Sequence, residues 1–208
     1  MRRLKKIFRA CFWFILITMV VVSVYYLFHN YRILKQVYQH EEQVEAVLEQ
    51  KDMLQYKEIV LAIIFTETKG SGEDPMQSSE SSYGKANQIT EKKESIEQGV
   101  DFLKQAIKDS QNKNCDIWTG IQAYNFGLDY IDFIAQNGGV NTMELAEQYS
   151  RDTLAPLLGN TDKKQYRYLQ VDSLIYNGGY LYHNGGNFFY ANLVKKNLKK
   201  IEATSFLF

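Results

Sequence analysis

The sequence has few cysteines, and the two that it has lie far apart. Cys11 lies in an apolar run near the N-terminus and Cys115 in the middle of the chain, so no disulfide can stabilise the domain that follows the run. The histidines are also scattered, because His29, His40 and His183 have neither a cysteine nor a second histidine beside them. We therefore expect no disulfide framework and no metal site.

Sequence signatures of several enzyme classes are absent as well. The chain contains no Gly-rich phosphate loop, no dinucleotide-binding fingerprint and no serine nucleophile elbow. No alternation of apolar and polar residues is long enough for a large sheet, and no internal repeat is present. These absences predict a mainly helical domain without a recognisable nucleotide site.

Acidic residues are absent before Glu41, although the formal net charge of the whole chain is zero. Five of the 24 basic residues lie before residue 10, namely Arg2, Arg3, Lys5, Lys6 and Arg9. Residues 10–208 therefore carry 19 basic and 24 acidic residues, a net charge of −5. This balance argues against a nucleic-acid partner, which needs a basic face.

The N-terminal region has the features of a membrane anchor. Residues 10–28 form a run of 19 residues without a charge, which is long enough to cross the hydrocarbon layer as a helix. The basic residues on its N-terminal side place residues 1–9 in the cytoplasm and the remaining chain outside the cell. A cleaved signal peptide is the alternative, but the run ends in Tyr25-Tyr26-Leu27-Phe28 and lacks a small-residue cleavage site. Cys11 precedes most of the run, so we do not expect lipoprotein processing.

The segment after the span is predicted to be a helical stalk that lifts a domain off the bilayer. Residues 29–52 contain neither glycine nor proline. Their apolar residues recur at helical spacing (Ile33, Leu34, Val37, Val44, Val47 and Leu48). We place the domain at residues 53–202 and a short C-terminal tail at residues 203–208.

The first helix of the domain, predicted over residues 53–68, carries a carboxyl group on its apolar face. Glu67 lies four residues after Ile63 and so shares that face. Burial against apolar groups raises the pKa of a carboxyl group, which allows it to act as a general acid near neutral pH. The alternative is a solvated glutamate at a helix end, or one paired with Lys69 or Lys85.

A long polar loop and further helices follow. Residues 69–95 are rich in Gly, Ser and Glu and predict a surface loop, of the kind that is often functional. Helical stripes begin near Ile96 and Ile117, and further helices are predicted over residues 142–154 and 187–202. The 15 tyrosines and 12 phenylalanines suit a core, and they also suit stacking on sugar rings.

Three separated segments carry a family resemblance. They read FTETKG at 65–70, DPMQSSES at 74–81 and AYNFG at 123–127. In order and spacing they resemble the lysozyme-like domain of bacterial muramidases and lytic transglycosylases. The chain is most similar to the Gram-positive domains of this kind, including the muramidase half of bifunctional wall hydrolases carried by conjugative elements and a pneumococcal surface antigen. The resemblance covers roughly residues 53–202 and implies an all-α, goose-type or lytic transglycosylase-like fold.

The resemblance implies roles for particular residues. Glu67 resembles the general acid of the family, and Gln77 and Asn125 resemble positions that hydrogen-bond the sugar or its N-acetyl group. Tyr124 is expected to pack beside them. Met76 is expected to pack in the core and to support the loop. Tyr190 resembles a tyrosine that reaches the catalytic acid, and three others compete for this assignment, namely Tyr176, Tyr180 and Tyr182.

A second catalytic carboxylate is left open by the sequence. The candidates are Glu73, Asp74 and Glu80, all in the polar loop. An inverting hydrolase places its base about 6.5–9.5 Å from the acid, and a retaining one places its nucleophile about 5–5.5 Å away. Transglycosylases of the resembling fold use the muramoyl 6-hydroxyl group instead, so they need no second carboxylate.

The sequence as a whole predicts a membrane-anchored enzyme that cleaves the β-1,4 bond between N-acetylmuramic acid and N-acetylglucosamine without a cofactor. Its expected partners are peptidoglycan strands and, through residues 10–28, the membrane. The resemblance to conjugative-element proteins adds secretion or conjugation machinery. Peptide cleavage is not expected, because no cysteine peptidase domain follows before Phe208. The alternatives are an inactive wall-binding scaffold and an accessory factor that binds protein.

Overall fold

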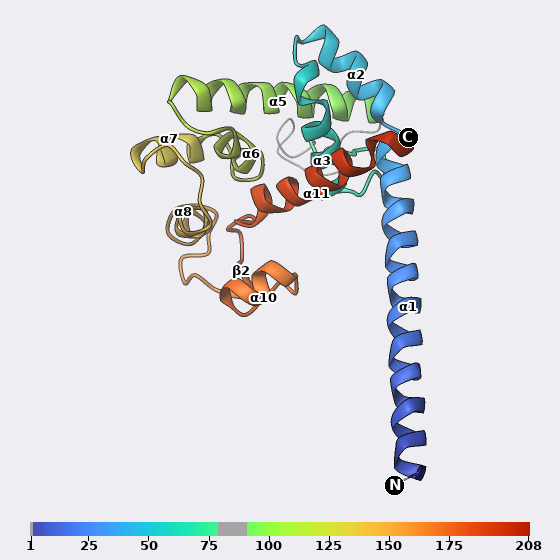
Figure 1. Cartoon of the computed structure of the whole chain (residues 1–208). Helices are drawn as coiled ribbons and strands as arrows, with labels where there is room; N and C mark the ends of the chain where they lie inside the picture. The colour runs from blue at the N-terminus through green and yellow to red at the C-terminus, as the bar shows by residue number, and fades with distance from the viewer. Residues whose placement is uncertain (1, 79–90) are drawn as a thin grey trace.

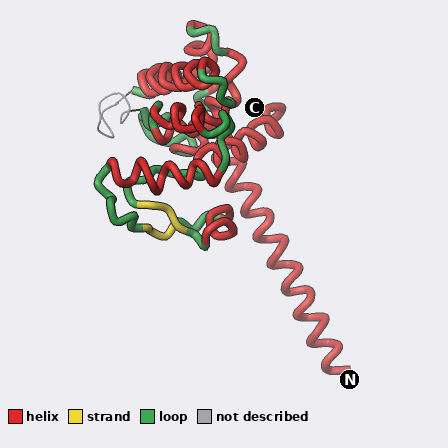
Figure 2. Tube along the Cα trace, turned by 90° about the vertical axis from the view of Figure 1, so that its left-hand side faces the viewer, coloured by secondary structure: helices red, strands yellow, loops and turns green. Residues whose placement is uncertain are grey.

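Helices make up most of the chain in the computed structural model, which describes residues 2–78 and 91–208 (Figure 1). The helices are α1 (Arg2–Tyr38), α2 (Glu41–Gln50), η1 (Leu54–Tyr56), α3 (Lys57–Glu67), α5 (Lys92–Asn112), α6 (Ile117–Phe126), α7 (Asp129–Gln136), α8 (Met143–Tyr149), η2 (Ser150–Leu154), α9 (Ala155–Leu157), α10 (Val171–Asn177), α11 (Tyr190–Thr204) and η3 (Ser205–Leu207). The strands β1 (Gln165–Arg167) and β2 (Tyr180–Tyr182) pair antiparallel. Figure 2 shows this small sheet at one edge of the helices. The predicted helical class is confirmed.

Helix α1 projects from the domain as a single long rod, with the N-terminus far from the other helices (Figure 1). Its residues Lys5–Tyr38 are long and apolar enough to cross a membrane, and its apolar window buries nothing within the protein. Most apolar side chains of the predicted span are exposed, as expected of a surface that would face lipid.

The segment predicted as a stalk differs in the structure, because it forms part of the domain. The last turns of α1 and the whole of α2 bury the six apolar residues of the predicted stripe, which belong to the same core cluster as α3. His40 joins α1 to α2, is buried, and its Nε2 lies 3.0 Å from the carbonyl oxygen of Gly70. Apolar residues at helical spacing indicate that one face of the helix is covered, but they do not indicate which element covers it.

Two apolar clusters form the core of the domain. The first surrounds α3, whose residues Val60 to Phe65 are all buried, and includes parts of α1, α2, α5 and α11. The second lies among α6, α7, α8 and β2 and is rich in aromatic rings, such as Tyr130 and Phe188. Helix α6 contributes to both clusters, with Ile121 in the first and Phe126 in the second. The end of α6 therefore stands where the two clusters meet.

The predicted tail also packs against the domain. Phe208 stacks on Tyr31 and Tyr38 of α1, with ring centroids 5.6 and 4.5 Å apart. Figure 1 accordingly shows the C-terminus beside the upper end of α1. The helices predicted over 53–68, 142–154 and 187–202 are present with shifted ends: η1 precedes α3, η2 continues α8, and α11 begins at Tyr190.

Candidate active site

Glu67 is the last residue of α3 and lies half-buried at the start of the polar loop. The hydroxyl group of Tyr190, the first residue of α11, donates a hydrogen bond of 2.6 Å to Glu67 Oε1. The two residues are 123 positions apart in the sequence. The side chain of Glu67 is therefore held by a residue from a distant helix and does not extend freely into solvent.

Two stacked tyrosines support this contact. Tyr190 is buried, and its ring lies parallel to that of Tyr124, with the centroids 6.2 Å apart and the planes at 7°. The hydroxyl group of Tyr124 donates to the carbonyl oxygen of Met76 at 2.9 Å. Burial, and next the nearby Glu67 carboxylate, raise the pKa of both tyrosines well above the ordinary value. Both hydroxyl groups therefore stay protonated and remain donors.

The loop after α3 is fastened to the helices on both sides. Thr68 Oγ1 donates to the carbonyl oxygen of Pro75 at 2.9 Å, which ties the loop to the end of α3. Met76 is fully buried in the first core cluster, in keeping with its expected packing role. Gly99 on α5 leaves room for it, because a Cβ atom there would lie 2.7 Å from Met76 Sδ and 2.8 Å from the Tyr124 hydroxyl oxygen.

Asp74 organises the same loop from inside. Its buried Oδ1 accepts hydrogen bonds from Ser95 Oγ at 2.6 Å and from the backbone nitrogen of Ser78 at 3.0 Å. The backbone nitrogen of Met76 in turn donates to Ser95 Oγ at 3.1 Å. Of the other two candidates for a second carboxylate, Glu73 is exposed, 3.9 Å from Lys92 Nζ, and Glu80 lies outside the described residues.

Gln77 follows Met76 with its side chain exposed. Its backbone has φ of +50°, a region that residues with a side chain seldom occupy and that clusters at functional sites. Its Nε2 donates to the carbonyl oxygen of Asp74 at 3.1 Å. The loop, which is tied to the end of α3 through Thr68 and Pro75, therefore presents Gln77 at the surface.

Asn125 lies in the last turn of α6 and is also exposed. Its Oδ1 accepts a hydrogen bond of 2.7 Å from the backbone nitrogen of Asn187, and Asn187 Nδ2 donates to the Tyr168 hydroxyl oxygen at 3.1 Å. The buried Gln122 donates to the carbonyl oxygen of Asn187 at 2.9 Å and accepts from the backbone nitrogen of Ala191 at 3.0 Å. Helix α6 therefore fixes the start of α11, and with it Tyr190.

Sequence reasoning missed Gln122, Asn187 and Ser95. The available signal for Gln122 was an amide between Ile121 and Ala123 on a predicted helix, since a buried amide needs hydrogen-bond partners. Asn187 gave a weaker signal as an asparagine directly after two glycines. Ser95 gave none, because serine is common at helix starts.

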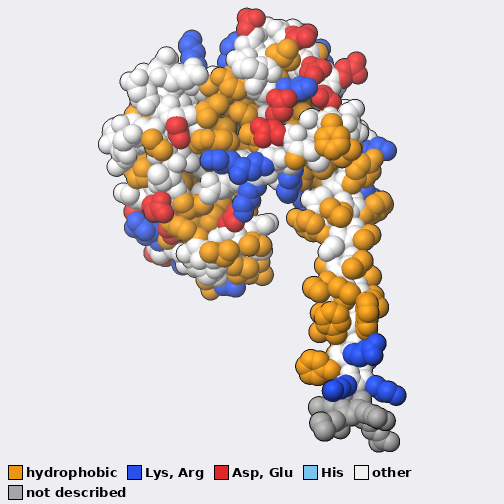
Figure 3. All heavy atoms as spheres, in the orientation of Figure 1, with side chains coloured by type: hydrophobic (Ala, Val, Ile, Leu, Met, Phe, Trp, Pro, Cys, Tyr) orange, Lys and Arg blue, Asp and Glu red, His pale blue; other side chains and the backbone are white. Residues whose placement is uncertain are grey.

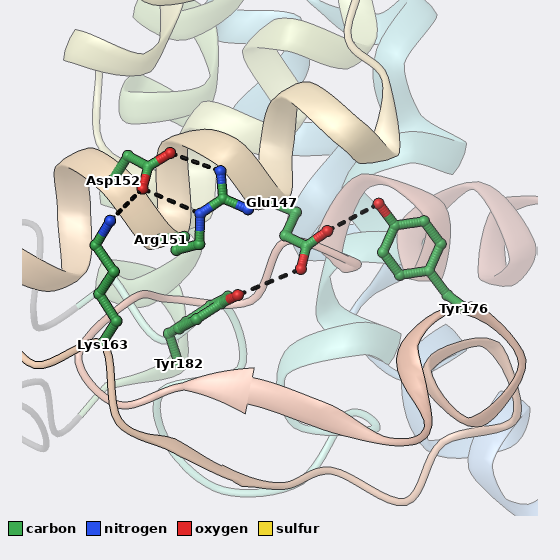
Figure 4. A network of polar contacts seen from close by, with 6 residues as sticks. All are labelled: Glu147, Arg151, Asp152, Lys163, Tyr176 and Tyr182. Atoms are coloured by element: carbon green, nitrogen blue, oxygen red, sulfur yellow. Dashed lines mark hydrogen bonds and ion pairs between the residues drawn. The ribbon is translucent and has the colours of Figure 1, made fainter.

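The other three candidate tyrosines bond or stack elsewhere. The hydroxyl groups of Tyr176 and Tyr182 donate to Glu147 of α8, at 2.9 and 3.4 Å (Figure 4). The guanidinium group of Arg167 lies over the ring of Tyr180, with Arg167 Cζ 4.6 Å from the ring centroid. Within residues 2–78 and 91–208, no group of three or more His, Cys, Asp and Glu side chains could hold a metal ion.

Comparison with known proteins gives consistent matches. The family model described as lysozyme-like matches residues 34–198, which includes most of the segment that forms the end of α1 and α2. The chain is 48% identical over 185 residues to pneumococcal vaccine antigen A of Streptococcus pneumoniae, covering 86% of this chain and 90% of that protein. It is 37% identical over 114 residues to a bifunctional muramidase/DL-endopeptidase of Bacillus subtilis, covering 53% of this chain and 34% of that protein.

A solved structure is similar as well. It is described as a protein similar to lipoprotein, of the NLP/P60 family, from Staphylococcus aureus. The TM-score is 0.71 at 32% sequence identity, over 79% of this chain. The match spans about half of that protein, 52% of its length.

Proposed function

The chain belongs to the lysozyme-like family, and we propose that it is a membrane-anchored enzyme that cleaves the MurNAc-β-1,4-GlcNAc bond of peptidoglycan. Family membership and the similarity to a bifunctional muramidase support a general role in peptidoglycan cleavage. The observation that carries the specific proposal is the contact between Glu67 and Tyr190, which joins a half-buried carboxyl group to a buried phenol at the start of the polar loop.

In the proposed reaction Glu67 donates its proton to the glycosidic oxygen as the bond to C1 breaks. A leaving sugar alkoxide is too basic to depart unprotonated, so this step needs a positioned acid. Tyr190 acts on Glu67 rather than on the sugar: its hydrogen bond fixes the orientation of the carboxyl group. The stack on Tyr124 fixes Tyr190 itself. Orientation of this kind is a large part of enzymatic rate enhancement.

The exposed amides of Gln77 and Asn125 are the proposed sugar-binding groups. Each is held by its own backbone or side-chain contact, Gln77 through Asp74 and Asn125 through Asn187. Amide side chains can both donate to and accept from an N-acetyl group. The two residues come from segments that both contact the Tyr124–Tyr190 pair, which would place a glycan between the loop and the end of α6.

The acceptor of the cleaved glycosyl group is the second part of the proposal. Asp74 is occupied by hydrogen bonds within the loop, so we do not assign it as the base. An attack by the muramoyl 6-hydroxyl group would need no second carboxylate, because Glu67 can accept the proton of that hydroxyl group once it has given its own to the leaving oxygen, whereas attack by water would need a second carboxylate as base. The products distinguish the two, as anhydro ends or as reducing ends.

The proposed location is the outer face of the cell membrane. Helix α1 supplies the anchor, and the basic residues before residue 10 favour a cytoplasmic N-terminus. A domain outside the membrane would face the cell wall, its proposed substrate. The wall could be opened locally there for secretion or conjugation machinery, and a deletion strain that transfers DNA at the normal rate would count against that role.

The test uses the full-length chain in detergent micelles with purified peptidoglycan. We expect soluble muropeptides from the wild type and none from Glu67→Gln. Glu147→Gln is the matched control, because Glu147 is also half-buried and accepts from tyrosine hydroxyl groups, but in the network of Figure 4. Mass spectrometry of the products then identifies the bond and the acceptor. Release from none of the three proteins would favour the inactive wall-binding scaffold.

A further inference from the structure

Helix α10 turns its apolar face away from the domain. Val171, Leu174 and Ile175 lie at positions i, i+3 and i+4, so they share one face of the helix. They are exposed by 68%, 47% and 80%, and Leu169 just before the helix is exposed by 67%. The apolar stripe of a surface helix ordinarily faces the core, and exposed apolar patches mark interaction sites.

This orientation is held by contacts on the opposite side of α10. Ser173 is fully buried there, and its Oγ donates to the carbonyl oxygen of Gln170 at 2.9 Å. Tyr176 donates to Glu147 of α8 (Figure 4). Asp172 forms an ion pair with Lys196 of α11. The bond of Ser173 closes the start of α10, and the other two contacts join α10 to α8 and α11, so the apolar face is exposed on a helix that is held at two points.

The exposed face lies close to the end of the membrane-spanning run. A cavity of about 450 Å³ separates α1 from the domain, and its lining includes Val171 and Asp172 from α10 and Tyr26 and His29 from α1. Aromatic residues at the end of a transmembrane helix lie at the level of the lipid headgroups. Figure 1 shows α10 at the end of the domain that points toward the N-terminal half of α1.

Basic side chains line the same cavity. Lys69, Lys196 and Lys200 are among its lining residues, and Lys196 pairs with Asp172, the one acid in the lining. Figure 3 shows lysine and arginine side chains gathered on the side of the domain that faces α1, with hydrophobic side chains below them. A basic region next to an apolar face, both beside a membrane span, matches the chemistry of an anionic lipid surface.

We propose that α10 and the lysine-lined cavity form a second contact with the membrane. Val171, Leu174 and Ile175 enter the interfacial layer of the bilayer. Lys69 and Lys200 bind the phosphates of anionic lipid headgroups in the space between α1 and the domain. This contact fixes the height and tilt of the domain above the membrane. The inference rests on the membrane anchoring proposed above, but not on catalysis.

The test measures depth in the bilayer with the full-length chain in nanodiscs of phosphatidylcholine and phosphatidylglycerol. Both native cysteines are first replaced by Cys11→Ala and Cys115→Ala. A fluorophore is then attached after Ile175→Cys, Val22→Cys or Leu54→Cys, and quenched by nitroxide groups on the lipid chains near the headgroups. Leu54 is the matched control, because it is an exposed apolar residue of η1, which packs with α2 at the opposite end of the domain from α10 (Figure 1).

The expected result is loss of most of the fluorescence at positions 22 and 175 and little loss at position 54. Quenching at 22 without quenching at 175 would overturn the second contact and leave the anchor intact. A label at 22 that is not quenched would overturn the anchor and the second contact together. The readout does not involve cleavage, so a failure of the proposed enzymatic activity would not be confused with either outcome.

A second arm tests the lysines. The label at position 175 reports the second contact, and we compare the chains in which it is quenched with those in which it is not. In discs that contain phosphatidylglycerol, the ratio of quenched to unquenched chains should fall about fivefold for Lys69→Gln and about fivefold for Lys200→Gln. Lys195→Gln is the control, since the Lys195 ammonium lies over the ring of Trp118 and not on the cavity. An equal effect of Lys195→Gln, or no dependence on phosphatidylglycerol, would overturn the headgroup binding.

Discussion

The end of α3 and the loop that follows it each hold a carboxyl group, and the two groups have different surroundings. Asp74 is buried, and its Oδ1 is hydrogen-bonded by Ser78 and Ser95, which shape the loop. Glu67 is half-buried and is held by Tyr190 from another part of the chain. The comparison shows how different surroundings can give different roles to two carboxyl groups that lie seven residues apart in the sequence. One is a structural acceptor, and the other is a candidate acid.

The largest expected effect belongs to Glu67→Gln. We expect the rate of glycan cleavage to fall by about 10²–10⁴-fold, the contribution typical of a general acid. The melting temperature should stay close to that of the wild type, because the amide oxygen can still accept the Tyr190 hydrogen bond. The measurements are initial rates of muropeptide release and thermal denaturation of the same preparations. A near wild-type rate would remove the distinction between the two carboxyl groups.

The next effect is expected for Tyr190→Phe, which removes the donor to Glu67. A hydrogen bond to a charged group contributes about 1.5–3 kcal/mol, so the rate should fall by about ten- to a hundredfold. Tyr182→Phe is the matched control, because Tyr182 is also buried but donates to Glu147. Equal losses of rate in the two variants would show that Tyr190 acts only through packing.

Asp74→Ala should affect stability instead of chemistry. It leaves the Ser78 and Ser95 donors without this acceptor, which should lower the free energy of unfolding by about 1–3 kcal/mol. Chemical denaturation in detergent micelles, followed by tryptophan fluorescence, measures the change. Glu73→Ala at the exposed neighbouring position is the control and should have little effect. If Asp74→Ala instead abolished cleavage at unchanged stability, Asp74 would be a catalytic group.

The smallest effect concerns alkaline pH. The pKa values of Tyr124 and Tyr190 are raised by burial and by Glu67, so the folded state holds their protons more tightly than the unfolded state does. This contribution to stability is complete below the ordinary tyrosine pKa of about 10 and is lost as the pH rises above it. As the pH is raised above the ordinary tyrosine pKa, the melting temperature should fall less steeply with pH for Tyr190→Phe than for the wild type. An equal slope would contradict the prediction.

Much of the site around the end of α3 could be predicted from the sequence, because its signals are local. The spacing of Ile63 and Glu67 places both on one face of α3, and the AYNFG segment ends α6 as its glycine suggests. The exact partner of Glu67 could not be derived from spacing, since Tyr190 lies 123 positions away and three other tyrosines had similar neighbours. The role of Asp74 depends on Ser95, which is 21 positions away.

Apolar spacing was informative about faces but not about what covers them. The stripe from Ile33 to Leu48 was interpreted as a stalk, and it packs into the core of the domain. The stripe of α10 shows the opposite case, since it has the pattern of a core helix and faces outward. The first stripe packs against α3 and α5, whereas Val171, Leu174 and Ile175 of the second are exposed.

The most direct test of the acid role of Glu67 is a comparison of two substrates. The wild type and Glu67→Gln are each given peptidoglycan and an aryl glycoside of the same disaccharide with a nitro-substituted ring, which departs as a weakly basic phenolate without protonation. Our account predicts that the variant loses nearly all activity on peptidoglycan and retains most of its activity on the aryl glycoside. An equal loss on both substrates would contradict a general-acid role for Glu67.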